Sequence, residues 1–209
     1  MRAGLELREL DAGEFLASLD ACTSIYAAAM GPPEYQLPGR HSIMERHSGY
    51  TAFRAIAAVL GPWDGHAVAG GPQPLVGFAY GFHGEAGQWW HDLVSQAVAR
   101  AMGRQAAEDW LADSFEIAEV HVLPGHQGRG TGLAMMLRLA AGRPERTAVL
   151  STRDANTRAR RLYRGLGFTD LLAGFAFAGT EEPYAIMGAP LPLRDPSSRP
   201  PRPERPSRW

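Results

Sequence analysis

A short glycine-rich run carries the residues best suited to bind an anion: Gln127, Gly128, Arg129, Gly130, Thr131 and Gly132. It follows a strand predicted over residues 116–123 and precedes a run, from Leu133 to Ala140, whose apolar residues recur at helical spacing. The first N–H groups of a helix have no internal partners and gather partial positive charge, and glycines leave these groups uncovered. The sequence therefore predicts a phosphate site at the start of this helix, with Arg129 adding a full charge.

Two common phosphate motifs are excluded by the residues in and around this run. The dinucleotide fingerprint requires a glycine at the sixth position counted from Gly128, where this chain has Leu133. A Walker-type loop requires a lysine, and the sequence contains none. When the run is considered alone, an ordinary glycine-rich turn is the alternative interpretation.

The run resembles the signature of the GNAT superfamily, the acetyl-CoA-dependent N-acetyltransferases. That signature is Gln/Arg-x-x-Gly-x-Gly/Ala at a strand-to-helix turn, and Gln127, Gly130 and Gly132 match it. The resemblance in the order of elements extends over residues 4–190, whereas the specific motifs lie within residues 115–168. The run is preceded by Val-Leu-Pro, and further residues follow in the family's order and at about its spacing: Asn156, Tyr163, Gly167 and Phe168.

The resemblance implies that acetyl-CoA is the co-substrate and that no metal takes part. The backbone of Val122 and Leu123 would pair with the pantetheine arm like an added strand, and a strand amide near Leu123 would stabilise the oxyanion. Residues 127–132 would bind the pyrophosphate through their N–H groups. Asn156 would hydrogen-bond the pantetheine arm from the other side. Its alternative role is the N-cap of the following helix, and one side chain can serve both roles.

Tyr163 is the predicted general acid. A phenol has a pKa of about 10, so it is neutral at working pH and can protonate the departing CoA thiolate. The position of Tyr163, seven residues after Asn156 and shortly before the Gly-Phe pair, favours this role under the resemblance. A tyrosine that only packs beneath the sheet is the alternative.

The general base is predicted to come from the strand over residues 116–123, which holds Glu116, Glu119 and His121. Strand alternation places Glu119 and His121 on one face and Glu116 on the other, unless a β-bulge intervenes, as is common next to active sites. Several family members use a strand glutamate, so the order of preference is Glu119, then Glu116, then His121. A solvated or salt-bridged strand residue is the alternative for each.

The elements that must position these residues follow the order β-α-α-β-β-(α insertion)-β-α-β-α-β-β. A capping box of Asp11 and Glu14 begins the first helix, which should run to about Met30. The predicted fold class is α/β, an α+β arrangement with a mixed sheet, and the resemblance implies a GNAT-like acyl-CoA N-acyltransferase fold with splayed central strands. Strands are predicted over residues 4–10, 53–60, 75–83, 116–123, 146–152, 168–177 and 184–189, a second short helix over residues 39–49, and a long flexible connection over residues 61–74.

Residues 87–113 form a predicted helical insertion between the third and fourth strands, where the family usually has a short hairpin turn. The insertion is rich in tryptophan, including Trp89, Trp90 and Trp110. One interpretation is that these tryptophans pack the insertion onto the sheet. The other is a lid that shapes the acceptor site, or a subunit contact in a homodimer, since insertions on a shared scaffold are where specificity varies.

Composition limits the other classes of function. The 209 residues have a net charge of −1, which offers no field for nucleic acid or an anionic membrane, and no run is long and apolar enough to span a bilayer. Cys22 is the only cysteine, so a cytoplasmic protein without an internal disulfide is expected. Residues 1–191 are predicted to form a single GNAT-like domain, and residues 192–209 a disordered tail rich in proline and arginine.

These features together predict an N-acetyltransferase that moves the acetyl group of acetyl-CoA to a primary amine of a small molecule or peptide, by direct attack in a ternary complex. One alternative is a transferase of the same fold that uses a different acyl-CoA. Another is a non-catalytic acyl-CoA-binding or sensor module. The intact glycine run, Asn156 and Tyr163 argue against this last alternative, because a module without activity need not keep a leaving-group acid.

Overall fold

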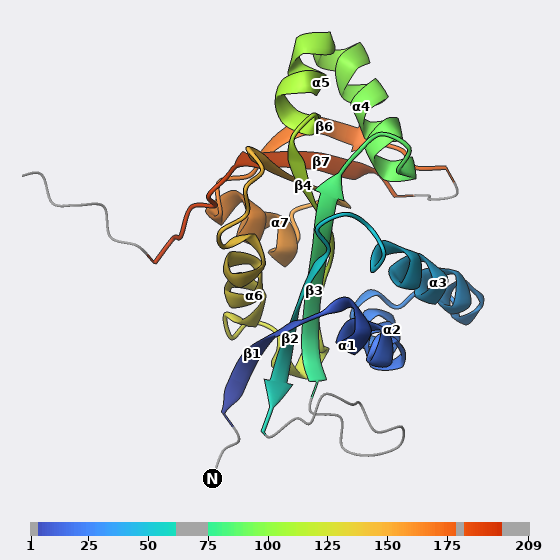
Figure 1. The fold of residues 1–209 in the computed structure, drawn as a ribbon, viewed down its shortest axis with the longest axis vertical. Helices are drawn as coiled ribbons and strands as arrows, with labels where there is room; N and C mark the ends of the chain where they lie inside the picture. Colours follow the sequence, from blue (N-terminus) through green and yellow to red (C-terminus); the bar gives the residue numbers. More distant parts are fainter. Residues whose placement is uncertain (1–3, 62–74, 179–181, 198–209) are drawn as a thin grey trace, which may run out of the picture.

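A computed structural model describes residues 4–61, 75–178 and 182–197 of the chain. Within these residues a seven-stranded sheet has the strand order β1-β2-β3-β4-β5-β7-β6 (Figure 1). The β4 and β5 strands pair in parallel, and every other neighbouring pair in the sheet is antiparallel, so the predicted mixed sheet is confirmed. The strands are β1 Leu5–Leu10, β2 Arg54–Leu60, β3 Leu75–Gly84, β4 Ser114–Val122, β5 Thr147–Arg153, β6 Thr169–Phe175 and β7 Tyr184–Pro190.

Helices cover both faces of this sheet, and their buried residues form three clusters (Figure 1). On one face, α6 and α7 pack against the middle strands. On the opposite face, α1, α2 and α3 cover the first strands, while α4 and α5 cover β5, β7 and β6. The helices are α1 Ala12–Ala17, α2 Leu19–Met30, α3 Leu37–His47, α4 Trp89–Met102, α5 Arg104–Leu111, α6 Thr131–Ala140 and α7 Arg158–Gly165, with short 3₁₀ turns η1 Glu34–Gln36 and η2 Pro124–His126.

The first predicted helix is divided in the structure. The capping box is present, since the Asp11 side chain accepts from the backbone N–H of Glu14 and the Glu14 side chain accepts from that of Asp11. The helix breaks at Ser18, whose φ of −104° and ψ of 4° depart from helical values. The Ser18 hydroxyl donates to the carbonyl of Glu14 at 2.9 Å, which is the local competition with helix bonds expected of serine. The prediction of one continuous helix to Met30 was therefore wrong.

The helical insertion lies where the sequence predicted it, as α4 and α5. Gly103 separates the two helices with a φ of 97°, a conformation that favours glycine. Val94, Val98 and Leu111 are buried against Val149 of β5 and Ile186 of β7. The insertion is thus part of the packed body of the protein, and it covers a face of the sheet that would otherwise be exposed.

The central strand β4 has two irregularities that create space. Tyr80 of β3 pairs with Glu119 and the next residue of β3 pairs with Ile117, so Ala118 is an extra residue that forms a β-bulge. On its other side, β4 pairs with β5 only from Ser114 to Glu116. Beyond Glu116 the two strands separate, which confirms the predicted splay and leaves the second half of β4 without a strand neighbour on that side.

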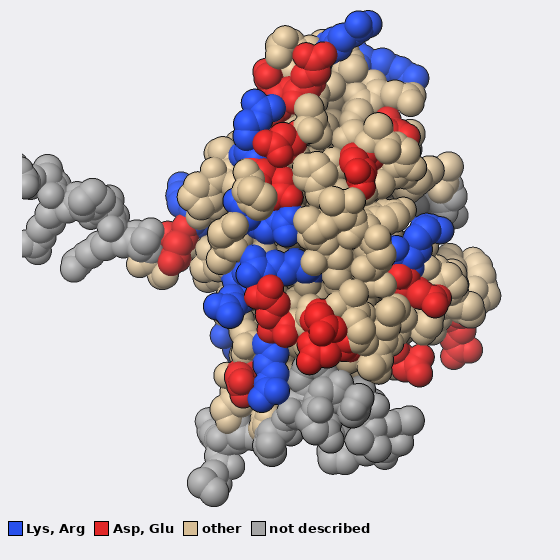
Figure 2. All heavy atoms as spheres, viewed as in Figure 1, with Lys and Arg blue, Asp and Glu red and all other residues tan. Residues whose placement is uncertain are grey.

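The predicted connection and tail lie largely outside the described residues, since residues 62–74 and 198–209 are not among them. Immediately after β7, Leu193 packs against the core, and Arg194 donates from its backbone to the carbonyl of Leu166 at 3.0 Å. The chain beyond residue 191 therefore contacts the end of α7 before it leaves the described part. On the face seen in Figure 2, acidic and basic side chains are interspersed. None of the described helices is long and apolar enough to cross a membrane.

Candidate active site

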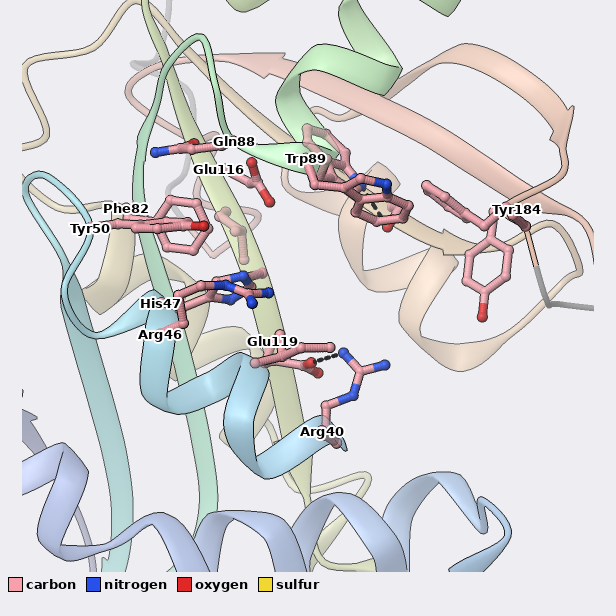
Figure 3. A pocket seen from close by; sticks show the side chains of 17 residues that line it. Arg40, Arg46, His47, Tyr50, Phe82, Gln88, Trp89, Glu116, Glu119 and Tyr184 are labelled. Carbon is pink, nitrogen blue, oxygen red and sulfur yellow. Dashed lines mark hydrogen bonds and ion pairs between the residues drawn. The ribbon is translucent and has the colours of Figure 1, made fainter. Parts of the chain in front are cut away.

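A pocket of about 300 Å³ opens over the bulge of β4, between the helices that cover the first strands and the helices of the insertion (Figure 3). Its size is at the lower end of the range for small-ligand sites. Its walls come from α3, β4, the start of the insertion and the chain that joins β6 to β7. The lining residues are Arg40, Ile43, Arg46, His47, Tyr50, Phe82, Gln88, Trp89, Trp90, Glu116, Ile117, Ala118, Glu119, Ser151, Phe177, Ala178 and Tyr184.

The bulge decides which carboxylates reach this pocket. Regular alternation would place Glu116 and Glu119 on opposite faces of β4. The extra residue at Ala118 shifts the alternation by one position, so both glutamates line the same pocket. A β-bulge was the condition under which Glu116 and Glu119 were predicted to share a face, and the structure contains that bulge.

Glu116 is buried without a partner. Its side chain is only 4% exposed, and its Oε2 atom has no hydrogen-bond partner among the described residues. Figure 3 shows its carboxyl group pointing into the space between Trp89 and His47. Burial disfavours the charged form and raises the pKa of Glu116 to about 8. A carboxyl group with this pKa exchanges protons readily near neutral pH.

Glu119 is buried with two partners. Arg40 of α3 donates to its Oε1 at 2.8 Å, and the His121 ring bonds to its Oε2. Burial alone would raise the pKa of Glu119, but His121 and Arg40 together hold it below its usual value. Glu119 is therefore an anion at neutral pH, and its charge is already shared with an arginine and a histidine.

His47 is a third titratable side chain on the pocket wall. Its Nδ1 lies 3.1 Å from the Tyr80 hydroxyl, and its ring packs against Tyr50 and Phe82. Burial lowers the pKa of His47 to about 4, so the imidazole is neutral at physiological pH. The functional residues of α3 were not predicted from the sequence, although Arg40, Ile43 and His47 recur at spacings of three and four residues, which is a signal for one helix face.

The insertion contributes an aromatic wall. Trp90 donates from its indole N–H to the Ser151 hydroxyl at 3.3 Å, which ties the start of α4 to β5. Trp89 remains 63% exposed, with its ring centroid 5.8 Å from that of Phe177. Both predicted roles of the insertion are thus compatible with the structure, since other residues pack on the sheet while these two tryptophans line the pocket.

The glycine-rich run forms an open turn at the start of α6. Gly128 and Gly130 have φ values of 75° and 84°, and Gly130 is the N-cap of α6. Residues 128–130 are exposed, so no packed side chains cover their amides. A Cβ atom added to Gly128 would lie 3.2 Å from the Arg158 guanidinium, which places a second cation beside the turn. The helix start, its bare amides and Arg158 together suit a phosphate group.

The backbone next to this turn is partly occupied. The N–H of Leu123 donates to the carbonyl of Val76 at 2.9 Å, so this amide is not free to act as an oxyanion donor. Along a strand, the backbone N–H groups of successive residues point to opposite sides. The N–H of Val122 therefore points away from β3, toward the side on which β5 has separated from β4. The Val122 carbonyl accepts from the Gln127 side chain at 2.9 Å. Val122 therefore offers a free N–H donor at the splayed edge of β4. It is the neighbour of Leu123, near which the oxyanion donor was predicted.

Tyr163 and Asn156 lie outside the pocket wall. Tyr163 is buried against Phe168, its hydroxyl has no hydrogen-bond partner among the described residues, and burial raises its pKa well above the usual value. Asn156 is exposed, and its side-chain oxygen accepts from Arg161 at 2.9 Å. The N-cap of α7 is Thr157, whose side chain accepts from the Arg160 backbone. The alternative assignment of Asn156 as the cap was therefore wrong by one residue.

Comparison with known proteins gives consistent matches. A family model described as an acetyltransferase (GNAT) domain matches residues 76–170. A GCN5-like protein acetyltransferase of Mycobacterium tuberculosis is 46% identical over 124 residues, which are 57% of this chain and 60% of that protein. A mycothiol acetyltransferase of Kineococcus radiotolerans is 34% identical over 109 residues, 44% of this chain and 36% of that protein. The chain thus spans less than two thirds of the length of these curated relatives.

Solved structures match over nearly the whole chain. The ribosomal-protein-S18-alanine N-acetyltransferase from Escherichia coli covers 94% of this chain and 99% of its own, with a TM-score of 0.58 and 16% identity. The PaiA N-acetyltransferase from Thermoplasma acidophilum, solved in complex with coenzyme A, covers 90% and 99%, with a TM-score of 0.53 and 12% identity. At these identities the likeness concerns the fold alone.

Proposed function

This chain belongs to the GNAT acetyltransferases, and from that premise we propose that it transfers the acetyl group of acetyl-CoA to a primary amine of a peptide or small molecule. The amine attacks directly, with both substrates bound at once. The observation that carries the proposal is the pocket at the bulge of β4. There an unpartnered, buried carboxyl group, that of Glu116, lies beside the point where β4 and β5 separate.

Acetyl-CoA would be held by the residues that follow the bulge. The free N–H of Val122 suits the pantetheine arm, and the exposed amides of residues 128–130 suit the pyrophosphate, with Arg129 and Arg158 nearby. The chemistry that the bound thioester supplies is an activated acetyl group with a thiolate as leaving group. Asn156, whose oxygen is held by Arg161, keeps its side-chain N–H groups for the pantetheine arm.

Glu116 is proposed as the general base, ahead of the two other candidates on its strand. It takes the proton that the amine nitrogen loses as that nitrogen bonds to the thioester carbonyl carbon. A base with a pKa near the working pH is the most effective, and the pKa of Glu116 is about 8. Glu119 is bonded to His121 and paired with Arg40, which lower its pKa, and His121 is not among the residues that line the pocket.

Tyr163 is proposed as the general acid that gives a proton to the sulfur as the carbon–sulfur bond breaks. Its raised pKa keeps the phenol protonated, and its hydroxyl is not committed to another described residue. The charge of Glu119 contributes to that rise in pKa, which indicates that the phenol lies within electrostatic reach of β4. A protonated donor close to the splayed edge is the arrangement that the departing thiolate needs.

The acceptor would enter over α3 and the insertion. Trp89, Trp90 and Tyr184 present aromatic surface, which attracts a cationic amine or its alkyl chain. Among the relatives, the protein of Mycobacterium tuberculosis is named a protein acetyltransferase, and this favours a peptide amine over a small one.

The proposal is tested by thiol release from acetyl-CoA across a panel of lysine peptides, peptides with a free N-terminus and small amines, with mass spectrometry of the acceptor. We expect thiol release that depends on the amine, with a gain of one acetyl group on nitrogen. Release with propionyl-CoA or succinyl-CoA but not with acetyl-CoA would instead support a transferase for another acyl group. Binding of acetyl-CoA without release for any amine would support the non-catalytic module and contradict the proposal.

A further inference from the structure

The charges that line the pocket do not balance. Arg40 and Arg46 are its two arginines, and Glu116 and Glu119 are its two carboxyl groups. At neutral pH Glu119 is an anion, whereas Glu116 is mostly protonated because of its burial. His47 is neutral because burial lowers its pKa. At neutral pH the lining of the pocket therefore has two positive groups against one negative group.

The unbalanced charge can be assigned to Arg46. Arg40 is paired with Glu119 at 2.8 Å, and its guanidinium also lies 4.8 Å from the centre of the Tyr26 ring. Arg46, in contrast, has no ion pair or hydrogen bond through its side chain within the described part of the chain. It lies beside His47 in the last turn of α3, at the exposed edge of the pocket (Figure 3).

A simpler role for Arg46 is to interact with the partial negative charge at the end of α3. That role explains a cation in the last turn, but it does not require the side chain to line a pocket. The same pocket is lined by Tyr50, Phe82 and His47, none of which is a carboxylate that could pair with Arg46. Because Arg46 is itself exposed, an ion pair formed with it is partly screened by water.

Arg46 and Glu116 lie on different elements of the pocket wall, the last turn of α3 and the strand β4. A peptide can reach both at once, with its reacting amine at Glu116 and a neighbouring side chain at Arg46.

Resting on the proposed acetyl transfer, we propose that the acceptor is a peptide in which an acidic side chain neighbours the residue that carries the reacting amine, and that Arg46 binds this side chain. The amine then reaches Glu116 at the floor of the pocket while the acidic side chain stays at the edge. Arg46 selects the acceptor and takes no part in the proton transfers.

The test uses the full chain, acetyl-CoA and peptides with one free amine, either a lysine side chain or the N-terminus. Each peptide is made with Glu, Gln or Arg at the neighbouring positions. The wild-type protein should prefer Glu over Gln by roughly fivefold in kcat/KM for the peptide, the size expected of one partly exposed ion pair. R46Q should remove this preference, and R46E should reverse it in favour of the Arg peptides. The KM for acetyl-CoA should stay unchanged in both variants.

R104E is the matched control, because Arg104 is exposed on α5 and does not line the pocket. It changes the net charge by as much as R46E does and should keep the wild-type preference. Equal kcat/KM values for Glu and Gln peptides in an active wild-type protein would overturn the inference while the proposed function stands. A preference that R46Q does not alter would also overturn it. Free lysine acetylated in preference to lysinamide, with no peptide acetylated, would overturn the peptide assignment. Absence of transfer to every amine would overturn both proposals.

Discussion

On β4, the stretch before the bulge and the stretch after it place two glutamates on the same face, in opposite surroundings. Before the bulge, Glu116 has an oxygen without a partner, and burial raises its pKa to about 8. After the bulge, Glu119 bonds to Arg40 and His121, and its pKa is lowered. Both side chains are almost fully buried, so burial alone does not set the charge of a carboxyl group. The partners decide whether it can accept a proton or only hold a cation in place.

The largest difference between these two positions should appear in the rate. E116Q removes the proposed base and should lower kcat/KM for the amine by about a thousandfold at a pH above about 8, since a general base contributes about 10² to 10⁴. E119Q removes a carboxylate that already has partners and should lower it by less than about tenfold. Steady-state kinetics with a fixed amine compares the two variants. Equal losses in both would remove the distinction between them.

A smaller effect is expected at the proposed acid. Y163F should lower turnover by about a hundredfold, because the thiolate would leave without a positioned proton donor. The dissociation constant of acetyl-CoA, measured by calorimetry, should change little, since the phenol is not among the groups proposed to hold it. If turnover is unchanged, Tyr163 only packs beneath the sheet against Phe168.

The smallest effect concerns stability. Because the folded protein holds a proton on Glu116 that the unfolded chain releases, its stability should fall as the pH rises from above the ordinary glutamate pKa toward about 8. E116Q lacks this titration. It should therefore gain about 2 kcal/mol relative to the wild-type protein between about pH 6 and about pH 8. Urea denaturation at several pH values measures this difference, and parallel curves for the two proteins would contradict the raised pKa.

The donor side of the site could be predicted because one continuous stretch builds it. The strand, the glycine turn and the start of α6 follow each other between Glu116 and Gly132, and backbone amides are the groups proposed to do most of the binding. Local spacing therefore placed the turn and the start of the helix correctly. The cap of α7 was missed by one residue, since Asn156 and Thr157 are both good capping residues and only the backbone conformation selects Thr157.

The acceptor side could not be assembled from the sequence, because side chains from distant segments meet there. Arg46 of α3, Trp89 of the insertion and Tyr184 of β7 have no common local pattern. The bulge at Ala118 has no clear signal in the residues around it either, so the face of Glu116 stayed conditional. The pairing register of β3 and β4, which is a property of the folded sheet, decides the composition of this pocket.

The most direct test of the central claim is the ratio of kcat/KM for the wild-type protein to that for E116Q, measured with one amine from about pH 6 to about pH 9. Taking the ratio removes the titration of the amine itself, which is the same for both proteins. If Glu116 is the base, the ratio rises about tenfold for each pH unit below about 8 and becomes constant above it. A ratio that does not change with pH over this range would contradict the claim.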